Sequence, residues 1–145
     1  MREHDKRICF SSQTDEYETP QIIFDQLNEK WHFTLDVCAT INNAKCDNFF
    51  TKEQNGLRHS WKNQTCWMNP PYGRDIKYWI SKAYLELINN GTSTIALLPA
   101  RTDTKWFHDY IYSKGIKFDL LRGRLKFNNH TQNAPFPSMI VEFVK

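Results

Sequence analysis

The chain carries Thr65-Cys66-Trp67-Met68-Asn69-Pro70-Pro71-Tyr72 (TCWMNPPY, residues 65–72), and this stretch decides how the rest is interpreted. Residues 65–68 predict a short buried strand that runs directly into a polar turn. Consecutive prolines each fix φ at about −65° and carry no backbone N–H donor. Nearby carbonyl oxygens are therefore left free to accept hydrogen bonds from a ligand.

Strand and helix signals alternate on both sides of this segment. Further strands are predicted at 32–38, 47–51, 93–98, 116–121 and 138–144, with a piece at 124–127 that extends a strand or forms a short edge. Helices are predicted to start at Thr19-Pro20, to run from Asp75 to Asn89-Asn90-Gly91, and to cover 104–113. This alternation predicts an α/β fold with an open, mostly parallel sheet and helices on both faces.

In such sheets a ligand lies beyond the carboxyl ends of the strands. Two polar turns are predicted at such ends, one after the strand that carries Asp36 and one at Asn69 to Tyr72. The two turns are expected to border one site.

The residue types of the second turn suit work on a planar amine. The exocyclic amine of a base is a poor nucleophile because its lone pair is delocalised into the ring. Acceptors that grip its two hydrogens, Asn69 Oδ1 and the Pro70 carbonyl, would favour a tetrahedral nitrogen able to attack a sulfonium methyl group. A base within a duplex must first be flipped out, and Tyr72 offers a flat face for it.

The bulk properties fit an ordinary globular domain. The length of 145 residues and a formal net charge of +3 allow a polyanionic partner without establishing one. The first residues are charged and the apolar stretches are too short to span a bilayer, so a cytoplasmic protein is expected. The four cysteines form no C-x-x-C pair and the histidines are scattered, so no metal site is predicted.

Several stretches, in order, resemble the small phage-type DNA N6-adenine methyltransferases, a Dam-like family. The stretches are DEYETP (15–20), FTLDVCA (33–39), Asn55-Gly56-Leu57 with Trp61, the turn at 69–72, LLPARTDT (97–104) with Trp106-Phe107-His108, and GRLKF (123–127). The turn alone is shared by many amino-methyltransferases. Its combination with LLPARTDT and GRLKF is much more specific.

The resemblance implies a single-domain class I methyltransferase (Rossmann-like) fold that uses S-adenosylmethionine on double-stranded DNA. It implies that Thr19, Pro20 and the turn holding Asp36, Cys38 and Ala39 line the cofactor pocket, that Leu57 lies near the cofactor's adenine ring, and that Asn69, Pro70, Pro71 and Tyr72 hold the target adenine. Residues 39–43 contain no glycine, unlike the Gly-rich loop of larger relatives.

Residues 1–16 are expected to be a flexible segment and 17–145 one methyltransferase domain without a separate target-recognition domain. Sequence reading must then come from short loops or from a second subunit, which makes a homodimer compatible with the chain. Protection of phage DNA from restriction is a hypothesis from the family alone.

Other polar residues have two interpretations each. Asp36 binds the cofactor's amino group or ribose, or it caps a turn; Glu53 binds the ribose or is an exposed loop carboxylate. Arg122, Arg124 and Lys126 contact DNA phosphates or protect a solvated edge strand. Arg101 follows a strand end and is expected at the rim of the site, where it would touch DNA.

Adenine N6 is the leading target. Cytosine N4 poses the same chemical problem, and relatives that modify RNA or a glutamine side chain fit the phage-like stretches less well. A DNA-binding module that kept the fold and lost turnover is the alternative from another class. The intact Asn69 and Tyr72 argue against it, whereas the glycine-free turn favours it.

Overall fold

The computed structural model describes residues 16–145, so the segment predicted to be flexible, 1–16, lies outside the described residues except for Glu16. The helical elements in that range are α2 (Gln21–Trp31), η1 (Gly56–Arg58), α3 (Ile76–Asn90), α4 (Lys105–Phe107) and the π-helical turn η2 (His108–Tyr112). The strands are β1 (Leu35–Asp36), β2 (Thr65–Met68), β3 (Ser93–Pro99), β4 (Lys117–Leu120) and β5 (Ser138–Phe143).

The strands form one mixed sheet in the order β1-β2-β3-β5-β4. β1, β2 and β3 are parallel, whereas β5 is antiparallel to both β3 and β4. The α/β prediction is confirmed, but the prediction of a mostly parallel sheet is wrong. The connection 121–137 contains no helix, and a chain that returns to a sheet without a crossover helix commonly pairs antiparallel.

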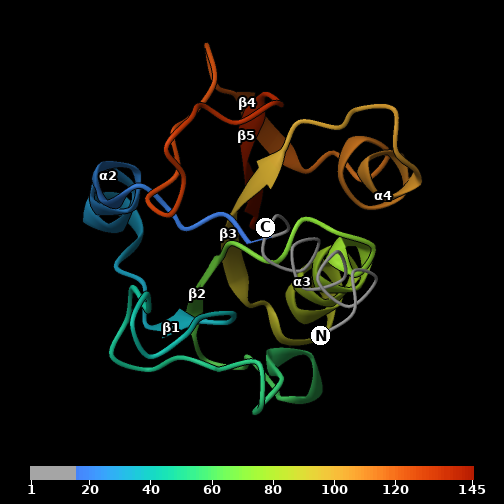
Figure 1. The fold of residues 1–145 in the computed structure, drawn as a ribbon. Coiled ribbons are helices and arrows are strands. Elements are labelled where there is room, and N and C mark those ends of the chain that lie inside the picture. The colour runs from blue at the N-terminus through green and yellow to red at the C-terminus, as the bar shows by residue number, and fades with distance from the viewer. Residues whose placement is uncertain (1–15) are drawn as a thin grey trace, which may run out of the picture.

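Helices lie on both sides of the sheet (Figure 1), with α2 on one side and α3 and α4 on the other. Phe24 of α2 packs edge-on against Trp67 of β2, with the ring centroids 5.6 Å apart. The predicted helix is present as α3, and its apolar residues three and four positions apart are buried: Ile76, Trp79, Ile80, Ala83 and Leu87. α3 is followed by its C-cap residue Gly91, whose φ of 68° suits a glycine.

Several predicted elements are shorter or absent. The strand predicted at 32–38 is only β1, because His32 ends α2 in the left-handed region (φ 53°) and the chain bends again after Asp36. The strand predicted at 47–51 amounts to one bridge between Asp36 and Phe49. Residues 124–127 form no strand, and the helix predicted at 104–113 divides into α4 and η2.

The start of α2 also differs from the prediction. Pro20, not Thr19, occupies the N-cap position, and it makes no side-chain cap hydrogen bond. The Thr19 hydroxyl instead accepts a hydrogen bond from the Asn69 amide, with 2.9 Å between Nδ2 and Oγ1. The helix thus begins without its predicted cap because that side chain is used at the polar turn.

Within residues 16–145, no helix is long and apolar enough to cross a membrane. In the same range, no group of three or more His, Cys, Asp or Glu side chains is placed to hold a metal ion.

Candidate functional site

A pocket of about 440 Å³ lies at the carboxyl ends of β1 and β2. Because these strands are parallel and adjacent, with Asp36 beside Trp67, the turns that follow them leave the sheet at the same edge. The pocket is lined by Glu16, Tyr17, Glu18, Thr19, Asp36, Cys38, Ala39, Thr40, Asn43, Lys45, Thr51, Lys52, Asn55, Trp67, Asn69, Pro70, Pro71, Asp75 and Trp79.

The Asn69 side chain has a fixed orientation. Its Nδ2 donates to the Tyr17 carbonyl and to Thr19 Oγ1. A backbone carbonyl can only accept, so the amide nitrogen must face Tyr17 and Oδ1 must face the other way. Oδ1 is buried and has no hydrogen-bond partner among the described residues. A buried acceptor without a partner is uncommon and is often found where a ligand supplies the donor.

Tyr72 anchors the end of the turn to β3. Its side chain is 2% exposed, and its hydroxyl donates to the Leu97 carbonyl over 2.9 Å. Burial raises the pKa of this phenol well above its ordinary value, so it remains a neutral donor. Nη1 of Arg101, the residue expected at the rim, donates to the Tyr72 carbonyl over 3.0 Å. These bonds leave the Tyr72 side chain little freedom.

Asp36 places a buried carboxylate in the pocket wall. Its side chain accepts hydrogen bonds from the backbone N–H groups of Lys45 (3.0 Å) and Cys38 (3.3 Å). Burial raises the pKa of this carboxyl to about 6, although the two N–H donors and the Lys45 charge oppose the rise. Burial, with the Asp36 charge, also raises the pKa of the Cys38 thiol to about 12. Cys38 is therefore an uncharged part of the wall.

The glycine-free turn closes through side chains. The Thr40 N–H donates to Asn43 Oδ1 over 2.7 Å, and the Asn43 N–H donates back to Thr40 Oγ1 over 3.2 Å. No residue of 39–43 has a positive φ. The turn therefore needs no glycine, and the missing glycines are not a sign of a damaged site.

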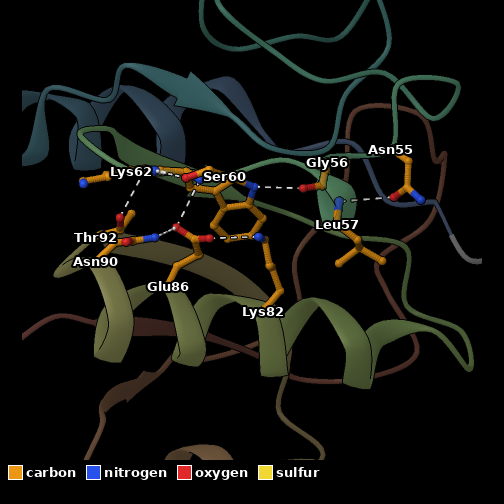
Figure 2. A network of polar contacts seen from close by, with 10 residues as sticks. Asn55, Gly56, Leu57, Ser60, Lys62, Lys82, Glu86, Asn90 and Thr92 are labelled. Atoms are coloured by element: carbon orange, nitrogen blue, oxygen red, sulfur yellow. Dashed lines mark hydrogen bonds and ion pairs between the residues drawn. The ribbon is translucent and has the colours of Figure 1, made fainter.

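A polar network ties the far wall to α3 (Figure 2). Glu86 accepts from the Trp61 N–H, Lys82 and Asn90. The Trp61 indole N–H donates to the Gly56 carbonyl over 3.0 Å. Burial alone would raise the pKa of Glu86, but these hydrogen bonds hold it below its ordinary value. The network positions η1 and, beside it, Asn55 in the pocket wall.

The 16–19 segment covers the pocket and is held by the 128–130 loop. The Glu18 N–H donates to Asn129 Oδ1 over 2.9 Å, and the Asn128 N–H donates to the Glu18 carbonyl over 3.0 Å. His130 and the Asn129 amide both contact the Glu16 carbonyl. In Figure 1 the 121–137 connection passes beside the start of the coloured chain. The asparagines and the histidine thus bind the chain's own backbone.

Comparison with known proteins decides the family. The family model described as DNA N-6-adenine-methyltransferase (Dam) matches residues 8–141. The chain belongs to this family. It is a DNA adenine-N6 methyltransferase that uses S-adenosylmethionine.

Two relatives carry the same description, "DNA N-6-adenine-methyltransferase". The protein of Haemophilus phage HP1 (strain HP1c1) is 31% identical over 139 residues, which cover 91% of this chain and 80% of the relative. The protein of Escherichia phage T1 is 35% identical over 96 residues, which cover 64% of this chain and 39% of the relative.

For this Dam-family chain, the structure gathers most of the predicted site residues in one place. Thr19, Asp36, Cys38, Ala39, Asn69, Pro70 and Pro71 all line the pocket. Pro20, Glu53 and Leu57 do not line it, and Tyr72 lies behind the turn. Arg122, Arg124 and Lys126 are exposed in the 121–137 connection, which is irregular there rather than an edge strand.

Sequence reasoning missed several lining residues. Glu16 belongs to the segment expected to be flexible, and Trp79 belongs to the apolar face of α3, where it is mostly buried. Thr40 and Asn43 could have been found from the sequence, because a Thr and an Asn three positions apart are typical of a reciprocally hydrogen-bonded turn. A larger hollow of about 660 Å³ beside residues 47–51 contains none of the predicted site residues.

Proposed function

We propose that the 440 Å³ pocket binds S-adenosylmethionine, and that Asn69 Oδ1 and the Pro70 carbonyl grip the N6 amine of a flipped adenine at its edge. The observation that carries this proposal is the buried Asn69 Oδ1 without a partner. The adenine amine has two N–H donors, and one of them would satisfy this oxygen.

The pocket residues fit the cofactor. S-adenosylmethionine supplies an electrophilic methyl group on a positively charged sulfur, next to a second positive charge on its amino group. The buried Asp36 carboxylate provides a complementary negative charge in the wall. The flat side chains of Trp67 and Trp79 and the turn at Ala39 supply apolar wall. Glu53 and Leu57, outside the lining, are not needed for this binding.

The turn would act by holding the target amine in position and by polarising its N–H bonds. Tyr17 and Thr19 hold the Asn69 amide so that its oxygen stays aimed away from them. Two fixed acceptors on the two amine hydrogens draw the nitrogen toward a tetrahedral shape and localise its lone pair. An amide oxygen is a poor base, so the proton released after methyl transfer goes to water. One such preorganised contact is worth about 10²–10³ in rate.

The substrate and assembly are also proposals. We propose duplex DNA with an extruded adenine, read by loops of a single domain that has no separate target-recognition domain. Arg101 would lie at the rim, because it is bonded to Tyr72 and exposed. The family description favours adenine N6 over cytosine N4. A homodimer stays a prediction that sedimentation with and without DNA would test. Because the enzyme acts on DNA, we propose that it works in the cytoplasm of a bacterial host.

The central test expresses the chain in a bacterial strain without its own DNA methylases. Nucleosides from the host DNA are then analysed by mass spectrometry. We expect N6-methyladenine with the wild type and at least about 10²-fold less with Asn69→Ala, while calorimetry shows S-adenosylmethionine bound by both proteins. N4-methylcytosine instead would reassign the target. No modified base from a protein that binds the cofactor would favour the non-catalytic DNA-binding alternative.

A further inference from the structure

The 121–137 connection leaves the sheet at the same edge as the turn at Asn69 to Tyr72. β3 is parallel to β2, and β5 is antiparallel to both β3 and β4, so β2, β3 and β4 all run in one direction. Their carboxyl ends therefore share one edge, where the connection begins after β4 and returns to start β5. Figure 1 shows it as a long segment without a helix or strand. This segment thus lies beside the proposed site of the target adenine.

Two buried rings fix the base of the connection against the turn. Phe127 and Phe136 are 1% and 9% exposed, and both meet the Tyr72 ring at a steep angle, with centroids 6.2 Å and 5.6 Å away. The Ala134 N–H donates to the Leu125 carbonyl over 2.7 Å and joins the outgoing and returning chain. The part of the connection between these anchors is therefore held at a defined place beside the turn.

The tip of the connection, residues 131–133, carries three adjacent polar side chains. Thr131, Gln132 and Asn133 are all exposed, and each has uncharged donor and acceptor groups. None of these side chains makes a hydrogen bond with another residue of the described part of the chain. The side chains at 128–130, by contrast, bind the backbone of residues 16–19. The hydrogen-bonding groups of the tip are thus available to a partner.

The excess positive charge of the chain lies in the same connection. Arg122, Arg124 and Lys126 are exposed there, and residues 121–137 include no Asp or Glu. These three charges equal the formal net charge of +3 of the whole chain, so the rest of the chain is neutral overall. Cationic side chains fix a protein on DNA phosphates without reading sequence, whereas amide and hydroxyl side chains pair with base edges. The connection carries both kinds close together in sequence.

The tip can reach the bases that flank the target. Asn133 is three residues from Phe136, and an extended chain spans at most about 3.6 Å per residue, so their Cα atoms are at most about 11 Å apart. Successive bases of one strand are about 3.4 Å apart, so this reach covers about three base steps. An Asn or Gln amide can pair with both N6 and N7 of an adenine in the major groove. The amides of Gln132 and Asn133 therefore suit base pairs next to the target.

We propose that the 121–137 connection is the target-recognition element of this enzyme, with Gln132 and Asn133 paired to base edges beside the target adenine and the basic residues bound to phosphates. This inference rests on the proposed function of the turn at Asn69 to Tyr72, because that turn fixes where the target adenine lies. Gln132 and Asn133 are then specificity-determining residues. One chain carries both the residues that read the sequence and the residues that hold the reacting amine.

The first test maps N6-methyladenine by single-molecule sequencing in the genome of a bacterial strain without its own methylases. The wild type should modify adenine within one defined sequence and discriminate against a wrong flanking base by about 5- to 150-fold for each amide contact. Gln132→Ala and Asn133→Ala should each bring this ratio close to one at a single position of that sequence. Gln26→Ala, at an exposed glutamine of α2, is the matched control and should leave the sequence unchanged.

Two results would overturn the proposal. One is a recognised sequence that is the same for the wild type, Gln132→Ala and Asn133→Ala. The other is a wild type that modifies adenine in every sequence context. Both variants change exposed side chains that bind no other described residue, so their melting temperatures and affinities for S-adenosylmethionine should match those of the wild type. A changed sequence preference would therefore report on recognition and not on folding.

A second test separates the phosphate contacts from the base contacts. Lys126→Ala should raise KM for every DNA duplex by the same factor and leave the recognised sequence unchanged, because a phosphate contact carries no base information. Gln132→Ala should lower kcat/KM on the wild-type sequence and keep it on duplexes altered at the position that Gln132 reads. An altered preference with Lys126→Ala, beside an unaltered one with Gln132→Ala, would overturn the assignment of base reading to the tip.

Two outcomes distinguish the recognition role from the proposed function. A wild type that binds S-adenosylmethionine but methylates no DNA would remove both. Methylation of one defined sequence that is lost with Asn69→Ala, but keeps the same preference in Gln132→Ala and Asn133→Ala, would retain the proposed function and remove the recognition role alone.

Discussion

Asp36 is a carboxylate in a position where burial works against its charge. It is 3% exposed, and its pKa is raised to about 6 despite two backbone N–H donors. A positively charged ligand beside it would favour the ionised form. We therefore expect the affinity for S-adenosylmethionine to weaken as pH falls below about 6, approaching tenfold per pH unit. Calorimetric titrations between about pH 5 and pH 8 would measure this.

The matched variant is Asp36→Asn, which keeps the shape and removes the titration. Its affinity should be weaker at pH 7 and flat with pH; a wild-type slope in the variant would assign the titration elsewhere. The stability of the cofactor-free protein depends on the protonation of Asp36 in the opposite direction. Because the folded pKa lies above the ordinary 3.8, the folded state binds the proton more tightly. The Asp36 contribution to the free energy of unfolding is thus greatest below pH 3.8 and is lost as pH rises toward 6.

At the scale of elements, η1 packs closely against the chain just after β1. A Cβ added at Gly56 would lie 2.3 Å from the Val37 carbonyl oxygen and 3.3 Å from Trp79. Trp61 donates one hydrogen bond to Glu86 and another to the Gly56 carbonyl, so η1 cannot move away from this surface without breaking the second bond or shifting Trp61. Gly56→Ala should lower the free energy of unfolding by about 1–3 kcal/mol, the range for overpacking. Urea denaturation would measure the loss.

Gly115→Ala provides the comparison for that variant. Gly115 has a φ of 68° and no atom within 4 Å of a new Cβ, so alanine there adds only local backbone strain. Both variants should lose stability, but only Gly56→Ala should weaken S-adenosylmethionine binding, since Asn55 lines the pocket. Unchanged cofactor affinity in Gly56→Ala would show that η1 and the pocket wall are mechanically independent.

At the scale of the whole molecule, the basic residues of the 121–137 connection extend from the edge of the sheet that holds β4. Arg122, Arg124 and Lys126 are exposed there. Each that neutralises a DNA phosphate should contribute about one unit to the slope of log affinity against log salt concentration. Alanine at each position should therefore reduce the slope by about one, measured by fluorescence anisotropy with a duplex. Lys62→Ala, an exposed lysine of the loop before β2, should leave it unchanged.

Features of the molecule that depend on neighbouring residues could be predicted from the sequence, whereas features that depend on distant contacts could not. The stripe and ends of α3 were readable because Asp75, Gly91 and the apolar spacing are local signals. The direction of β5 was not, because a strand buried on both faces has the same apolar run in either direction. The role of the 16–19 segment was also hidden, since Glu18 and Asn129 are 111 positions apart. Asn69 and Asp36 were predictable as neighbours because adjacent parallel strands end at one edge.

β5 lies between β3 and β4 and is the only strand that joins them among residues 16–145. Ribosomes make proteins from the N-terminus, so β5 is synthesised after both of its neighbours. Until then the nascent chain presents two open edges, each with a row of unpaired N–H and C=O groups. The turn at Asn69 to Tyr72 is bonded through the Tyr72 hydroxyl to β3, one of these two strands. Chaperone demand and aggregation during expression should thus concentrate in the interval before residues 138–143 emerge.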